Sequence, residues 1–173
     1  MARADLDAHF AKIDELTEEI ERIVPTDGYQ NVQFRSDLAG LLVVAIAATY
    51  ESCVKDVLYE RALRHHVAFG AFAERNFEKL NSRIQIKDLK KYCQLFGSGA
   101  LQNEFRDRLK ERKEKLLQRS GKNIENCYEQ VLEWRHAFAH AMVRNHTIEE
   151  AVNTHRCAKR VLYVFDEVIS GSQ

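Results

Sequence analysis

Proline and glycine are scarce in this chain: its 173 residues include one proline and seven glycines. Hairpin turns draw heavily on these two residues, so a fold built from many strands is excluded. Hydrophobic residues make up 45% of the chain and charged residues 30%, which is ordinary for a globular protein and excludes disorder throughout. The composition therefore predicts an all-α fold, and the length predicts a single domain over residues 1–173.

The chain also lacks an excess of charge, paired cysteines and a long apolar run. Lys plus Arg and Asp plus Glu both number 26, so no net field attracts nucleic acid or a membrane. The four cysteines form no C-x-x-C pair, which favours reduced thiols. The N-terminus is acidic, unlike a signal peptide, and the longest uncharged stretch has 13 residues, whereas a membrane helix needs about 20. We therefore expect a cytoplasmic protein with no membrane partner.

Apolar periodicity predicts a bundle of about five to seven helices, with an N-terminal helix over 2–24 and a core over 36–169. The first helix carries one apolar stripe with 3-4-3-4-3 spacing: Leu6, Phe10, Ile13, Leu16, Ile20 and Ile23. Turn residues at 25–28 end it. A long second helix is expected from an N-cap at Ser36 to about His66, and its first half is apolar nearly all round.

The later helices are expected to be shorter. Two are predicted over about 71–80 and 86–96, the second ended by Gly97-Ser98-Gly99. A charged segment follows over 100–119, closed by Gly121. The next helix is expected over about 123–143, and the last runs from a capping box of Thr147 and Glu150 to about 169.

One arginine and two histidines lie within six residues of the helix expected over 123–143: Arg135, His136 and His140. The histidines are four residues apart and so share one helix face. One interpretation is that the histidines are hydrogen-bonded residues at the edge of the core, and that Arg135 pairs with Glu133 or with a carboxylate elsewhere. The spacing also suits zinc, but no glutamate of an H-E-x-x-H pattern lies between them, and a third ligand would have to come from His146 or His155.

The hexapeptide R-H-A-F-A-H, residues 135–140, resembles the R-x4-6-H signature of the HEPN superfamily, in which a polar residue usually follows the arginine. Residues 37–62 are similar to the long early helix of the RiboL-PSP-type HEPN branch, including an acid after the apolar run, here Glu51. Residues 76–97 look like that branch's connecting helices. The resemblance implies a HEPN-like up-and-down core and a ribonuclease site completed at the groove of a dimer.

The chain departs from the family pattern directly after the motif. Many relatives have a glycine after the motif histidine, where this chain has Ala141 and Met142. We therefore expect the helix to continue past His140.

Metal-free cleavage of RNA matches the chemistry of these residues. Attack by the 2′-hydroxyl needs a base and an acid with pKa values near neutrality, together with cationic donors for the charged transition state. We assign His140 as the principal acid and base, Arg135 as the phosphate clamp, and His136 as an auxiliary donor or an orienting group. Glu51 is expected to hold Arg135, to hold a backbone amide, or to contribute to the site directly. No cofactor and no metal is predicted.

The only basic patch lies at 106–122 and has a local net charge of +5. It is typical of a solvated helix with i,i+4 ion pairs such as Glu111 with Lys115. The alternative is contact with the RNA backbone through five residues: Arg106, Arg108, Lys110, Arg112 and Lys113.

The sequence and its resemblance together predict a metal-independent HEPN-type endoribonuclease. We expect a homodimer that cuts RNA as a toxin or effector, in antiviral defence or in a toxin–antitoxin system, with an antitoxin or defence-system protein as a partner. The alternative is a catalytically silent HEPN module that binds a nucleotide or a partner protein as a dimeric scaffold. A plain helical dimerisation module with a coincidental motif is the third possibility.

Overall fold

The computed structural model describes residues 2–26, 31–77 and 84–171, and these ranges contain helices and no strand. The helices are α1 (Ala2–Ile23), α2 (Val32–His65), α3 (Val67–Phe77), α4 (Ile86–Ser120), α5 (Ile124–Ala141) and α6 (Ile148–Gly171). The predicted all-α fold is confirmed. Of the turn expected at 25–28, Asp27 and Gly28 lie outside the described residues, as do the last three residues of the helix expected over 71–80.

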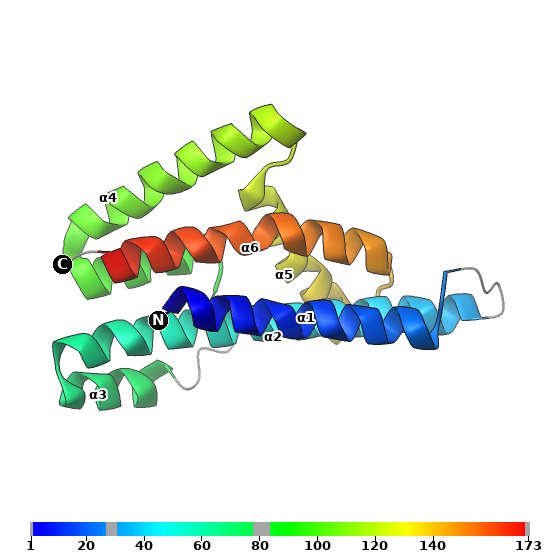
Figure 1. The fold of residues 1–173 in the computed structure, drawn as a ribbon, viewed down its shortest axis with the longest axis horizontal. Coiled ribbons are helices and arrows are strands. Elements are labelled where there is room, and N and C mark those ends of the chain that lie inside the picture. The colour runs from blue at the N-terminus through cyan, green and yellow to red at the C-terminus, as the bar shows by residue number, and fades with distance from the viewer. Residues whose placement is uncertain (1, 27–30, 78–83, 172–173) are drawn as a thin grey trace.

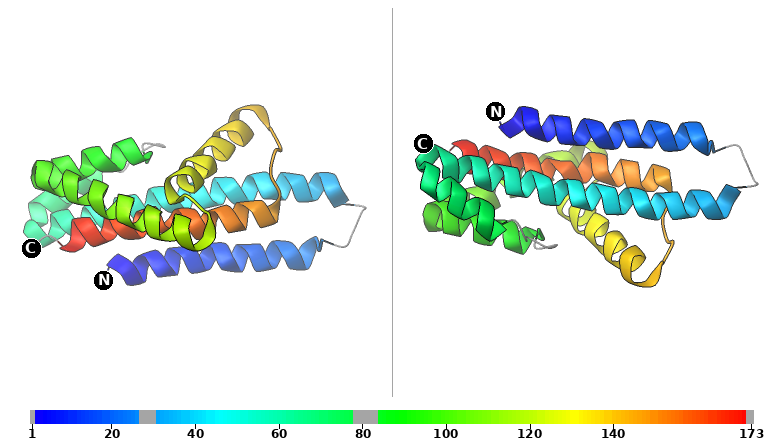
Figure 2. Two further views of the ribbon diagram at one scale, coloured as in Figure 1. Left: turned by 90° about the horizontal axis from the view of Figure 1, so that it is seen from above. Right: turned by 90° about the horizontal axis from the view of Figure 1, so that it is seen from below.

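Three long helices run side by side along the molecule: α1, α2 and α6 (Figures 1 and 2). The chain ends of α1 and α6 meet at one end of the bundle, where Arg3 pairs with Glu167 at 3.0 Å. α5 crosses this layer at an angle, and α3 folds back along the end of α2. In Figure 1, α4 lies on the side of α6 opposite α1. α2 is therefore the central helix, in contact with every other helix of the fold.

α2 is long and apolar enough, by length and composition alone, to cross a membrane. Half of its most apolar 18-residue window is buried against the neighbouring helices. The central place of α2 accounts for its composition, because a helix surrounded by others is apolar on most of its faces.

Aromatic side chains join four helices in the core. Tyr50 of α2 stacks on Tyr128 of α5 with ring centroids 5.3 Å apart, and its hydroxyl lies 3.0 Å from Nδ1 of His155 on α6. Phe10 of α1 packs edge-on against the same histidine at 5.5 Å. The Tyr128 hydroxyl donates to the carbonyl of Ile84 at 2.8 Å, which fixes the chain just before α4.

The helix boundaries confirm some predictions and overturn others. The first helix and its buried stripe are as predicted, except that Leu16 and Ile23 are exposed. The capping box of α6 forms as predicted: Thr147 N donates to Glu150 at 2.8 Å and Glu150 N donates to Thr147 at 3.1 Å. The N-cap predicted at Ser36 is wrong, because α2 already begins at Val32.

The break predicted at Gly97-Ser98-Gly99 is also wrong, since α4 is one helix of 35 residues. Its buried side chains keep a four-residue spacing across the glycines: Leu89, Cys93, Leu101, Phe105 and Leu109. A glycine inside a helix costs only about 1 kcal/mol relative to alanine, whereas each buried side chain of this stripe contributes about 1.5–3 kcal/mol. Burial on both sides of the glycines therefore outweighs their low helix propensity. The helix predicted to begin near Ala71 likewise begins earlier, at Val67.

Candidate functional site

α5 carries Arg135, His136 and His140 on two adjacent faces. Asn123 caps the start of the helix, and its side chain accepts from the amides of Glu125 and Asn126 at 3.0 and 3.4 Å. Its buried side chains follow a helical stripe toward the bundle: Ile124, Tyr128, Val131 and Phe138. Arg135 occupies the position between the last two of these, so its guanidinium is directed at α2 rather than into solvent.

On α2, Glu51 faces this arginine. Nη2 of Arg135 lies 4.0 Å from Oε1 of Glu51, and the two side chains are 30% and 20% exposed. The pair is long for a salt bridge, so most of the five guanidinium donors stay available to an incoming anion. Of the roles expected for Glu51, the geometry matches the one in which it holds the motif arginine.

The two histidines lie one turn apart on the exposed face of α5. Their ring centroids are 4.5 Å apart with an angle of 51° between the ring planes, as the i,i+4 spacing predicts. Both side chains are exposed and so remain accessible to a ligand. A pair of imidazoles at this separation offers one proton acceptor and one proton donor side by side.

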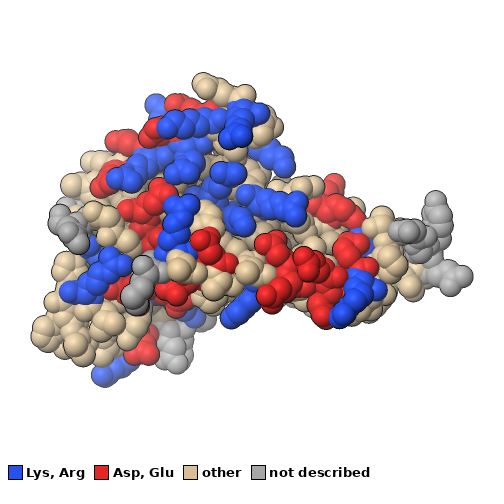
Figure 3. All heavy atoms as spheres, in the orientation of Figure 1, with Lys and Arg blue, Asp and Glu red and all other residues tan. Residues whose placement is uncertain are grey.

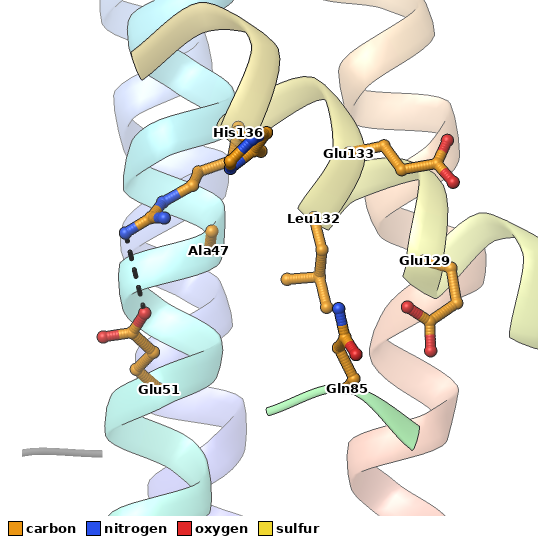
Figure 4. A pocket seen from close by; sticks show the side chains of 8 residues that line it. Ala47, Glu51, Gln85, Glu129, Leu132, Glu133 and His136 are labelled. Carbon is orange, nitrogen blue, oxygen red and sulfur yellow. Dashed lines mark ion pairs between the residues drawn. The ribbon is translucent and has the colours of Figure 1, made fainter. Parts of the chain in front are cut away.

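A pocket of about 500 Å³ adjoins these residues, between α2, α5 and the start of α4 (Figure 4). Its lining combines the predicted residues with others: Ala47, Glu51, Gln85, Glu129, Leu132, Glu133, Arg135 and His136. His140 is one turn beyond the lining. The lining holds three carboxylates and one guanidinium, so these charged groups sum to a negative charge.

Sequence reasoning did not single out Glu129, and it named Glu133 only as an alternative partner of Arg135, which instead faces Glu51. Glu129 accepts from the amide of Ile86 at 3.1 Å and so anchors the start of α4 against α5. The signal that could have found both is spacing, because Glu129, Glu133, His136 and His140 follow one another at four, three and four residues. Side chains at these spacings form a single polar stripe along the helix.

Gly40 sets how closely α5 approaches α2. It is buried in α2, and a Cβ atom built there would lie 2.1 Å from the ring of Phe138. The ring itself is 4% exposed. The absence of a side chain at Gly40 thus lets Phe138, at the centre of the motif, rest directly on the α2 backbone.

The segment after the motif ends α5 sharply. α5 continues past His140 only as far as Ala141, two residues short of the end expected near Val143, because Met142 adopts the left-handed conformation at φ 49°. The Met142 amide still donates to the carbonyl of Phe138 at 2.9 Å. A non-glycine residue in this conformation costs about 1–3 kcal/mol and persists only where its surroundings fix it.

Contacts of the following loop supply that constraint. The His146 ring stacks on Trp134 with centroids 4.6 Å apart, and its Nε2 lies 3.2 Å from the carbonyl oxygen of Ala39. Arg144 pairs with Asp37 at the start of α2. Burial lowers the pKa of His146, which favours the neutral ring in this stacked position.

The alternative metal site would draw its third ligand from His146 or His155. Both are buried and already packed, the first against Trp134 and the second against Tyr50. Within residues 2–26, 31–77 and 84–171, no three His, Cys, Asp or Glu side chains are grouped so that they could hold a metal ion. The i,i+4 histidines are therefore not joined by the further ligands which that interpretation requires.

None of the five basic residues proposed for RNA contact lines this pocket. All five lie on α4, and each is paired with an acidic side chain. The pairs are Arg106 with Asp107 (3.1 Å), Arg108 with Glu104 (2.7 Å), Lys110 with Glu114 (4.0 Å), Arg112 with Glu167 (3.3 Å) and Lys113 with Glu125 (2.7 Å). The predicted pair of Glu111 with Lys115 is confirmed at 2.5 Å.

Comparison with known proteins gives one result. A family model described as RiboL-PSP-HEPN matches residues 8–171, which is nearly the whole chain. No curated protein and no solved structure matches it. The matched range includes α5 and the segment of α2 that holds Glu51.

Proposed function

The chain belongs to the RiboL-PSP-HEPN family, and from this premise we propose that it is a metal-independent endoribonuclease. The observation that carries the proposal is the grouping on α5. Two exposed imidazoles lie 4.5 Å apart, next to an arginine that Glu51 holds across a pocket. These are the groups that transesterification of RNA requires.

In the proposed reaction the ribose 2′-oxygen attacks the adjacent phosphorus and the bond from phosphorus to the 5′-oxygen breaks. His140 takes the 2′ proton, and an imidazolium gives a proton to the departing 5′-oxygen. His136 supplies that second group in the same protomer, or His140 of a second copy supplies it across a dimer groove. Arg135 binds the phosphate oxygens through its planar fork of donors. The products are a 2′,3′-cyclic phosphate and a 5′-hydroxyl.

Glu51 serves as a positioning residue in this scheme. A half-buried guanidinium without a partner is costly, so the carboxylate keeps Arg135 in place before RNA arrives. The 4.0 Å separation leaves the arginine able to turn its donors toward phosphate.

We further propose that the active form is a homodimer. Exposed apolar side chains lie on both helices of the site: Val32, Phe34 and Leu41 on α2, with Met142 and Val143 directly after α5. Several large exposed apolar side chains near the motif favour such an interface. A two-fold contact here would bring two Arg135–His140 sets into one groove.

The cellular setting follows from the same premise. We propose a cytoplasmic toxin or effector of antiviral defence or of a toxin–antitoxin pair, with RNA as substrate and a partner protein that restrains or activates it. The support is the match of nearly the whole chain to this family, together with the resemblance of residues 135–140 to its motif.

The decisive experiment compares variants on a single-stranded RNA with and without one 2′-deoxy sugar. His140→Ala should lose about 10²–10⁴-fold in rate, and Arg135→Ala should lose both rate and affinity. The matched control is His65→Ala, an exposed histidine at the end of α2, which should cut normally. Cleavage should persist in EDTA and stop 3′ of the deoxy sugar. Efficient cutting at that sugar would contradict the mechanism. Nucleotide binding through Arg135 without any cleavage would favour the silent module instead.

A further inference from the structure

The basic residues of the second half of α4 are divided between two faces of the helix. Arg108, Arg112, Lys115 and Arg119 follow one another at four, three and four residues and line a groove of about 460 Å³ against α6. The four other cations of the basic segment do not line it: Arg106, Lys110, Lys113 and Lys122. From α6, Arg160 completes the basic lining, and Figure 3 shows Lys and Arg side chains gathered over these two helices.

The groove is cationic in a protein whose formal charge is zero. Its lining has five basic side chains and two carboxylates, Glu111 and Glu167. A third carboxylate, Glu104, pairs with Arg108 at 2.7 Å from outside the lining, so the cations still exceed these carboxylates by two. Glu167 is shared between Arg112 at 3.3 Å and Arg3 at 3.0 Å, so it neutralises neither fully. Across the part of the chain that the structure describes, neither Arg119 nor Arg160 has an acidic partner within 4.0 Å, and both are exposed.

The shape of this charge suits a chain of phosphates. The row from Arg108 to Arg119 extends about 16 Å along the helix, and a linear polyanion can follow it. Four of the five cations are arginines, whose planar forks bind phosphate oxygens in pairs. No aromatic side chain lines the groove, so bases have nothing to stack on and contact is with the backbone alone.

We propose that this groove binds the phosphate backbone of single-stranded RNA, without regard to sequence. Side chains of α4 and α6 line the groove, whereas α5, the helix of Arg135 and His140, lies behind α6 in the view of Figure 1. The groove therefore holds RNA outside the cleaved dinucleotide and raises the affinity for long substrates. The identity of the ligand rests on the proposed ribonuclease function.

The test measures binding of a labelled single-stranded RNA across a series of salt concentrations. The parent is the full chain with His140→Ala, which keeps the RNA intact. Adding Arg119→Gln and Arg160→Gln should weaken binding roughly tenfold. It should also reduce the slope of log affinity against log salt by roughly 1.4, since each contact with a single strand contributes about 0.7. The matched control adds Arg75→Gln and Lys87→Gln, two exposed cations on α3 and α4.

The control should leave the slope and the affinity unchanged, and circular dichroism should show every variant folded. Equal losses in the groove variant and the control would overturn the proposal, as would a groove variant that binds like its parent. Binding to anionic phospholipid vesicles, but not to RNA, would overturn it in favour of a membrane contact. If the wild-type protein does not cut RNA but the groove variant binds RNA more weakly than its parent, only the nuclease function is refuted. If the wild-type protein cuts RNA but the groove variant binds RNA as tightly as its parent, only the groove proposal is refuted.

Discussion

Replacing Gly40 by alanine tests whether the contact of α5 with α2 is as close as the structure has it. The new Cβ would lie 2.1 Å from two carbons of the Phe138 ring, which is buried and has little room to turn aside. Overpacking of a core typically costs about 1–3 kcal/mol, and this contact belongs at the upper end. Alanine recovers about 1 kcal/mol of helix propensity. We therefore expect a net loss of roughly 1–2 kcal/mol, or about 2–8 °C in melting temperature.

Two matched variants isolate the cause of this loss. Gly99→Ala places the same methyl group in α4, where no atom lies within 4 Å, and should stabilise the protein by about 1 kcal/mol. Adding Phe138→Leu to Gly40→Ala should recover part of the loss, because the smaller side chain makes room for the methyl group. Urea and thermal unfolding followed by circular dichroism measure all three. A Gly40→Ala protein as stable as Gly99→Ala would refute the close contact.

The same substitution links packing to activity. Phe138 lies between Arg135 and His140 in the chain, so moving its ring shifts both groups relative to α2. A misplacement of about 1 Å can cost on the order of 10²-fold in rate. The folded fraction of Gly40→Ala should therefore cut RNA far more slowly than wild type, and Phe138→Leu should restore part of the rate.

Burial lowers the pKa of His155 to about 3, so between pH 6.5 and 3 the unfolded chain binds a proton that the folded chain does not. The free energy of unfolding should therefore fall by about 1.4 kcal/mol per pH unit as the pH drops through this range. Urea unfolding should show a shallower pH dependence for His155→Gln, and an unchanged slope would count against the burial. Glu51→Gln removes the charge that positions Arg135, so kcat should fall about tenfold while KM does not rise; a pure rise in KM would contradict the positioning role. The Cys157 thiol lowers the pKa of Cys127 by a hydrogen bond, so iodoacetamide at neutral pH should label Cys127 before the buried cysteines, and Cys157→Ala should slow that labelling.

Local patterns predicted most of the helices because a helix face repeats every three or four residues. The stripe beginning at Leu6 and the capping box at Thr147 depend only on neighbours along the chain, and both are present. The predicted break at Gly97 is wrong because of tertiary packing, since other helices bury the side chains on both sides of the glycines. The predicted end of α5 was inaccurate for a similar reason, because no local sequence rule predicts that His146 stacks on Trp134.

The candidate site divides in the same way. The shared face of His136 and His140 follows from spacing, whereas the contact of Arg135 with Glu51 joins residues 84 positions apart and needed the family resemblance to be expected. No sequence pattern indicated that Arg119 of α4 and Arg160 of α6 line the same groove. Periodicity describes one helix at a time, and the packing between helices decides which faces meet.

The position of Arg135 is itself an argument for function. It stands in the buried stripe of α5, at a place where an apolar side chain would pack against α2 without any cost of desolvation. A charged group there needs Glu51 beside it, and replacing such pairs by apolar residues is often neutral or stabilising. Packing alone therefore does not favour an arginine at this position. The proposed ribonuclease function accounts for it, because in that proposal the arginine places a permanent charge where the substrate phosphate binds between α5 and α2.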